Sequence, residues 1–211
     1  MTRDHSHKPQ DIARRLAGGN QITYLKDMIY GGIDGAVTTF AIVAGVQGAG
    51  LSHHIIVALG IANILADGFS MAASNYSGTK AELDDRERIV EIEKSHIERH
   101  REGELEELRQ ILGLRGLTGA LQTRAAEVIA RDQSKWIDFM LTDEYGLARH
   151  APRPFRAALA TFAAFILAGS VPLIPFAAGL QNAFAISVTA TLLVFFLIGT
   201  GKSRWSLYRS W

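Results

Sequence analysis

Four long apolar runs constrain the fold of this chain more than any other feature of its sequence. They cover residues 29–51, 55–77, 155–178 and 184–200. A helix needs about 20 predominantly apolar residues to cross the hydrocarbon core of a bilayer, and each run is close to that length. Because lipid offers no hydrogen bonds to backbone groups, such runs must be helical inside a membrane. The sequence therefore predicts an all-α, polytopic membrane protein with four transmembrane helices.

The average composition hides this pattern, because 48% hydrophobic residues and a mean hydropathy of +0.10 are ordinary for a soluble domain. The charges are segregated instead. Residues 79–150 hold 16 of the 21 acidic and 12 of the 22 basic residues. Apolar residues recur there with a helical period, interrupted at Gly103, residues 113–119 and residues 132–134. We expect a hydrophilic insert of three or four helices, the first of which continues the second transmembrane helix.

The apolar residues of the insert that show helical spacing are Ile89, Ile92, Ile97, Leu105, Leu108, Leu112, Leu121, Ala125, Val128, Ile129, Trp136, Phe139 and Met140. In the first apolar run, small residues recur at spacings that let helices approach closely in lipid: Gly31, Gly32, Gly35, Ala41, Ala44, Gly45 and Gly48. In the third run, Pro172 and Pro175 predict a kink that a packed membrane helix tolerates.

The basic residues predict the orientation. Residues 47–54 and 179–182, which join the apolar runs in pairs, contain no Lys or Arg, whereas the N-terminal arm, the insert and the C-terminal tail are all basic. Positively charged segments remain on the cytoplasmic side of a membrane. We therefore expect both termini and the insert to be cytoplasmic.

Two carboxylates interrupt the apolar runs, Asp34 in the first and Asp67 in the second. A charged side chain at the centre of a membrane helix costs at least about 2.5–3.5 kcal/mol, so acids in two adjacent spans indicate an ion pathway. With a rise of about 1.5 Å per residue, both acids fall in the cytoplasmic half of the bilayer. Met71 follows Asp67 by one turn and shares its face.

Asn63 and Ser70 lie close to these residues on the second helix, which completes the predicted transport pathway of Asp34, Asn63, Asp67, Ser70 and Met71. Oxygen ligands with a thioether suit a divalent transition metal, because the soft sulfur disfavours Mg²⁺ and Ca²⁺. Protonation of the carboxylates would release the metal and so offers a route to proton coupling. In the alternative interpretation, the acids hydrogen-bond to each other or cap helices, and Met71 only fills volume.

These residues resemble a known family. Residues 33–45 (IDGAVTTFAIVAG) and 62–73 (ANILADGFSMAA) are similar to the first two membrane helices of the vacuolar iron transporter family, and the likeness covers nearly the whole chain. The resemblance implies a dimeric carrier that moves Fe²⁺, and often Mn²⁺, out of the cytosol in exchange for protons. It places the family's conserved Asp at Asp34 and its Met at Met71.

The chain also departs from the family pattern. Some members carry a Glu at the position of Asn63, and we expect Asp67, one turn later, to supply that charge. The family has five membrane helices, and the basic residues 202–211 resemble the loop that precedes the fifth.

In the family, the insert binds metal before the metal reaches the membrane site. The matching residues of this chain are Glu93, His96, Glu104, Glu107, Met140 and Glu144. Spacings of three and four place paired members on one helix face, and carboxylates on facing helices hold iron or manganese in helical bundles. Glu98, Glu102, Glu106 and Asp143 are alternative ligands. In the alternative interpretation, these acids form a solvated face that neighbouring arginines neutralise.

We therefore predict a divalent-metal transporter that exports Fe²⁺ or Mn²⁺ by proton antiport, works as a homodimer in a lipid bilayer and is not an enzyme. We expect no fixed cofactor and no nucleic-acid partner, and Zn²⁺ is a plausible surrogate metal. Cell-surface and organellar membranes fit equally well. The predicted parts are a cytosolic arm (1–28), a transmembrane hairpin with the transport site (29–78), a cytosolic helical metal-binding domain (79–150), and two further transmembrane helices with a basic tail (151–211).

Two other functions are consistent with parts of this pattern. In one, the protein is a membrane-tethered metal-binding or scavenging protein that collects iron without transporting it. In the other, it is a redox enzyme of the ferritin kind. A di-iron bundle needs two Glu-x-x-His motifs and two further glutamates, whereas the motif occurs once in this sequence, at Glu93-x-x-His96.

Overall fold

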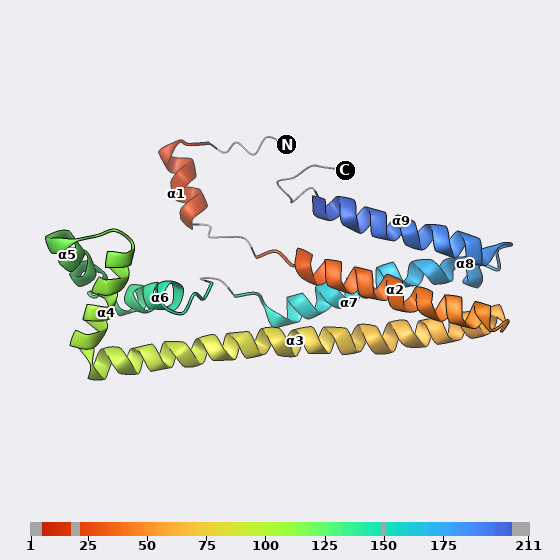
Figure 1. Cartoon of the computed structure of the whole chain (residues 1–211), viewed down its shortest axis with the longest axis horizontal. Helices are drawn as coiled ribbons and strands as arrows, with labels where there is room; N and C mark the ends of the chain where they lie inside the picture. The colour runs from red at the N-terminus through yellow and green to blue at the C-terminus, as the bar shows by residue number, and fades with distance from the viewer. Residues whose placement is uncertain (1–5, 18–21, 149–150, 204–211) are drawn as a thin grey trace. The chain divides into compact units, whose positions relative to one another are not determined.

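The computed structural model describes the chain except for residues 1–5, 18–21, 149–150 and 204–211. The described residues form helices joined by turns and contain no strand (Figure 1). Four stretches of helix are long and apolar enough to cross a membrane. The all-α fold class and the four transmembrane helices are therefore confirmed, whereas most of the predicted basic tail lies outside the described residues.

The four apolar helices belong to one compact unit, which comprises residues 23–80 and 152–211. Its helices are α2 (Leu25–Gly48), the first part of α3 (His53–Arg99), α7 (Pro154–Ser170) with the short α8 (Ile174–Ala177), and α9 (Ala183–Ser203). α2 begins at Leu25, before the apolar run predicted from residue 29. Its first turn is helical although it contains charged residues. α3 continues without a break into the insert, as predicted.

Glycines allow α2 to pack closely against α7. A Cβ atom on Gly31 would lie 2.3 Å from the Thr161 carbonyl oxygen, and one on Gly35 would lie 2.4 Å from that of Phe165. These are backbone contacts, which no change of rotamer can relieve. Gly45 and Gly48 face open space instead. The predicted small-residue contact is therefore present in the first half of α2 and absent at these two positions.

The prolines of the third apolar run produce the predicted kink. After α7, the chain forms a 3₁₀ turn, η1 (Val171–Leu173), that contains Pro172, and then α8, which contains Pro175. The Ser187 hydroxyl of α9 donates a hydrogen bond of 2.8 Å to the Pro172 carbonyl oxygen. A backbone acceptor at the kink is thus satisfied by a side chain, as is required away from water.

The second compact unit comprises residues 1–22 and 81–151. It contains α1 (Pro9–Ala17), the end of α3, α4 (Arg101–Leu114), α5 (Gly119–Ile129) and α6 (Gln133–Asp143). The insert core consists of Ile89, Ile97, Leu108, Leu112, Ala126, Ala130, Trp136, Ile137, Met140 and Leu141. Trp136 is fully buried, and the Arg101 guanidinium lies 5.1 Å from the centre of its ring.

One detail of the predicted insert is wrong. The break expected at Gly103 occurs at His100, and Gly103 lies in the first turn of α4, where Glu102 and Glu104 complement the positive end of the helix. Leu121 and Val128 are exposed by 66% and 55%. The short helix α5 contributes only Ala126 and its neighbours to the buried cluster, so these two residues face outward.

Candidate metal-binding sites

Asp34 lies half-buried on α2, next to a polar contact with α3. The Thr38 hydroxyl donates to the Asp34 carbonyl oxygen at 2.9 Å. The same hydroxyl oxygen accepts a hydrogen bond of 3.4 Å from the side-chain amide of Asn63. Asn63 of α3 therefore contacts α2 one helical turn after Asp34.

The other predicted pathway residues lie on the membrane part of α3. Met71 is half-buried, whereas Asp67 and Ser70 are exposed on the surface of this unit. Asp67 and Ser70 belong to a polar stripe on α3 whose members are spaced alternately by four and three residues. The stripe is formed by Asn63, Asp67, Ser70, Ser74 and Ser77. A carboxylate in contact with hydrocarbon is costly. The stripe therefore needs water or a second protein surface against it.

A side-chain network that the sequence analysis missed joins three membrane helices. The Asn75 amide donates to Asp27 Oδ1 at 2.9 Å and to Thr161 Oγ1 at 2.7 Å. The Thr79 hydroxyl donates to Asn75 Oδ1 at 3.4 Å. Asn75 lies one turn beyond Met71 on α3. This spacing is the sequence feature by which Asn75 could have been selected. Asp27 likewise precedes Asp34 by two turns on α2.

Glu93, His96 and Glu104 converge in the insert, where α3 turns into α4. Their ligand atoms lie within 4.8 Å of one another. His96 Nδ1 is 3.4 Å from Glu104 Oε1 and 3.9 Å from Glu93 Oε1. The turn at His100 ends α3 and starts α4 at Arg101, so that residues from both helices meet. His96 also lines an open groove on α3 of about 460 Å³, which gives access from solvent.

Both carboxylates of this cluster are buried, since Glu93 is 1% exposed and Glu104 is 7% exposed. The Oε2 atom of each is buried without a hydrogen-bond partner. Within the described part of the chain, no Lys or Arg forms an ion pair with either residue. Buried carboxylate oxygens normally have a donor, a cation or a proton. The cluster therefore has vacant acceptors of the kind that a metal ion uses.

Neighbouring carboxylates add to the negative potential. Burial, followed by the charges of Glu93 and Glu107, raises the pKa of Glu104 above its ordinary value. Partial burial, followed by the charges of Glu107 and Glu93, raises the pKa of Glu144 to about 7. Glu107 and Glu144 thus interact electrostatically with the cluster. Met140 is fully buried in the insert core.

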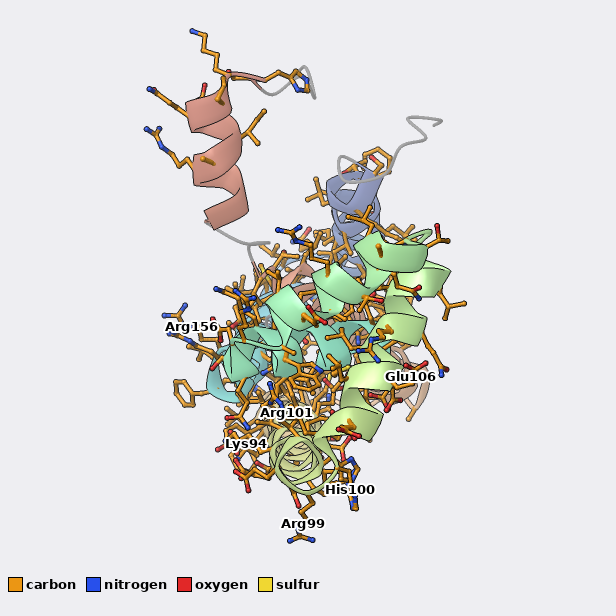
Figure 2. The ribbon with its side chains drawn as sticks, turned by 90° about the vertical axis from the view of Figure 1, so that its left-hand side faces the viewer. Lys94, Arg99, His100, Arg101, Glu106 and Arg156 are labelled. Carbon is orange, nitrogen blue, oxygen red and sulfur yellow. The ribbon has the colours of Figure 1, made fainter. Side chains whose placement is uncertain are left out.

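The alternative ligands have other environments. Asp143 forms an ion pair with Arg115, and Glu106 pairs with Arg109 at 3.2 Å. Glu98 and Glu102 are exposed. Figure 2 shows Glu106 pointing outward from α4 and His100 pointing outward from the end of α3. The solvated interpretation therefore describes these acids well, but it does not describe Glu93 and Glu104.

Tyr145 is a further residue of this region, and no sequence pattern singles it out. Its hydroxyl donates to Glu93 Oε1 at 2.9 Å, although the two residues are 52 positions apart. Burial and this hydrogen bond raise the pKa of Tyr145 above its ordinary value, so the phenol remains a donor.

These features define a polytopic membrane protein with a carboxylate-rich helical insert. Comparison with known proteins identifies it further: the chain belongs to the VIT family, whose model matches residues 25–211. The resemblance noted in the sequence is therefore confirmed, and the protein is an integral membrane protein.

Relatives match along most of the chain. Vacuolar iron transporter 1 of Oryza sativa subsp. japonica is 30% identical over 205 residues, which cover 96% of this chain and 79% of the relative. Vacuolar iron transporter 1 of Eucalyptus grandis is 32% identical over 181 residues, covering 84% and 73%. The vacuolar iron transporter of Toxoplasma gondii is 30% identical over 213 residues, covering 92% and 70%. These relatives are named as transporters and not as enzymes.

Proposed function

We propose that this protein transports a divalent transition metal, Fe²⁺ or Mn²⁺, out of the cytosol in exchange for protons. The observation that carries the proposal is the cluster of Glu93, His96 and Glu104, whose two buried carboxylates have no Lys or Arg partner among the described residues. The names of the relatives support iron as the transported ion. On this proposal the protein is a carrier and catalyses no chemical reaction.

The insert collects the ion. Glu93, His96 and Glu104 are the central ligands, and Glu107 and Glu144 add negative charge. Carboxylate and imidazole together suit Fe²⁺ and Zn²⁺, whereas oxygen ligands alone suit Mn²⁺. Zn²⁺ is therefore a useful redox-inert probe. Met140 is the least supported ligand, because it is fully buried in the insert core.

The membrane pathway then accepts the ion at Asp34, Asn63, Asp67, Ser70 and Met71. Asn63 already lies next to α2 through its bond to Thr38. Asp27 and Asn75 continue the same helix faces toward the ends that carry the basic flanks. By the positive-inside rule these ends are cytoplasmic. Protons that replace the metal on the carboxylates would reset the pathway and couple it to a pH gradient.

The exposed polar stripe on α3 supports a homodimer. Asp67, Ser70, Ser74 and Ser77 are exposed on a single copy of the chain. A second copy placed against this stripe would remove the carboxylate from lipid and bring two pathways together. The polar stripe has an alternating spacing of four and three residues, which is that of a helix face packed against another helix.

Flux through proteoliposomes tests the proposal. With a metal-sensing dye inside the vesicles, we expect uptake that depends on a pH gradient and is lost in Asp34→Ala and Met71→Ala. Met28→Ala is the matched control, because Met28 is an exposed methionine of the same membrane unit. Metal binding without any flux in the wild type would contradict transport and favour the membrane-tethered collector.

Binding by the insert is tested separately. Titration of the full chain with Zn²⁺ should show a site that is lost in Glu104→Gln. Glu98→Gln removes an equal charge from an exposed position of α3 and should bind like the wild type. Equal loss in both variants would mean that bulk charge, and not a defined site, attracts the ion.

A further inference from the structure

The end of α6 holds Tyr145 in a defined position. The Glu144 and Tyr145 amides both donate to the Met140 carbonyl oxygen, at 2.9 and 3.4 Å, and the Leu147 amide donates to that of Leu141 at 2.9 Å. Gly146 has a φ of +66°, the left-handed conformation with which many helices end. This capping turn fixes the Tyr145 backbone, and the side chain reaches Glu93 on α3 from there.

The two carboxylate oxygens of Glu93 consequently differ. Oε1 accepts the hydrogen bond from Tyr145 and lies 3.9 Å from His96 Nδ1, whereas Oε2 is buried without a hydrogen-bond partner. Glu93 is almost completely buried, so the phenol supplies a donor of the kind that a buried carboxylate oxygen requires. A hydrogen bond to one carboxylate oxygen fixes the rotamer of the group and weakens that oxygen as a metal ligand. Groups that bind ligands in this way commonly orient a metal site.

We propose that Tyr145 is a positioning residue that restricts Glu93 to a single bond with the cation. This inference rests on the proposed function. The restriction favours small transition metals over Ca²⁺. Ca²⁺ takes six to eight oxygen ligands and often binds a carboxylate through both oxygens. Zn²⁺ takes about four ligands, so one oxygen from Glu93 is sufficient. The phenol thus selects by limiting the number of oxygens that the site supplies.

Tyr145→Phe tests this, because it removes the hydroxyl and keeps the ring. The full chain in detergent is titrated with Zn²⁺ and with Ca²⁺ in separate experiments. The part of the binding that is lost in Glu104→Gln is assigned to the insert. We expect Zn²⁺ affinity to fall by about 10- to 100-fold, as for other residues that orient metal ligands. Ca²⁺ affinity should fall less, or rise, so the ratio of the two affinities decreases about tenfold or more. Tyr76→Phe is the matched control, since it removes a hydroxyl from the membrane part of α3.

A merely structural role would give a different result. It would lower the unfolding temperature of the metal-free protein and weaken both metals by the same factor, and that outcome would overturn the inference. Unchanged Zn²⁺ affinity in Tyr145→Phe would overturn it as well. A wild type that binds Zn²⁺ no better than Glu104→Gln would instead refute the insert site of the proposed function, and the inference with it.

Discussion

Proton release at Glu144 provides a quantitative test of the insert site. Its pKa of about 7 means that its carboxyl is about 0.9 protonated at pH 6 and about 0.1 protonated at pH 8. A cation that binds to this group, or next to it, must displace that proton. We therefore expect metal binding at pH 6 to release about 0.9 proton more from the wild type than from Glu144→Gln. At pH 8 the difference should be about 0.1 proton.

The same linkage predicts how affinity changes with pH. Below the pKa, competition with one proton weakens binding about tenfold per pH unit, so the wild type should gain about tenfold in affinity between pH 6 and pH 8 beyond any gain of Glu144→Gln. Calorimetric titration with Zn²⁺ in two buffers of different ionisation enthalpy measures the released protons directly. Glu98→Gln should behave like the wild type. If the wild type and Glu144→Gln release equal numbers of protons at pH 6, Glu144 does not participate and the reasoning fails.

Three further predictions concern stability. Folding raises the carboxyl pKa values of Glu104 and Glu144, so the folded metal-free protein binds more protons than the unfolded chain between pH 4.5 and about 7. Its thermal stability should therefore fall as pH rises through this window, and it should fall less steeply in Glu144→Gln. A stability that rises with pH would contradict the assignment. Gly35→Ala should destabilise the membrane unit by about 1–3 kcal/mol through its clash with the Phe165 backbone, whereas Gly45→Ala, which meets open space, should be neutral or stabilising in the same detergent unfolding assay. Asn75→Ala should cost about 0.6–2 kcal/mol, since Asp27 and Thr161 lose their shared donor, and unchanged stability would show that the network does not hold the helices together.

The transmembrane helices could be predicted because lipid leaves an apolar run no alternative to a helix. The pairing of those helices could not, because α2 packs on α7 through backbone surfaces opened by Gly31 and Gly35. Nothing in the local sequence states which partner fills the space beside a glycine. The network of Asn75 depends on that pairing, since its acceptors Asp27 and Thr161 come from α2 and α7. A polar residue one turn beyond Met71 was visible, but its partners were not.

The insert site shows a similar division. Glu93 and His96 share one helix, so their spacing alone placed them together. Glu104 joins them because the chain turns at His100 and not at Gly103. Tyr145 could not be selected, because an aromatic residue after a helix end commonly only packs, and its partner is 52 positions away. Residues of one helix are thus predictable from periodicity, whereas the residues that complete the site depend on tertiary structure.

Ion pairing separates the two interpretations that the sequence left open for the acidic insert. If the insert were only a solvated charged surface, each acid would be exposed or would lie next to an arginine, as Glu106 does with Arg109 and Asp143 with Arg115. Glu93 and Glu104 are buried instead, and each keeps one oxygen without a partner. Such desolvation is unfavourable for a carboxylate and is offset only by a proton or a cation. A proton and a metal ion therefore compete for these two carboxylates.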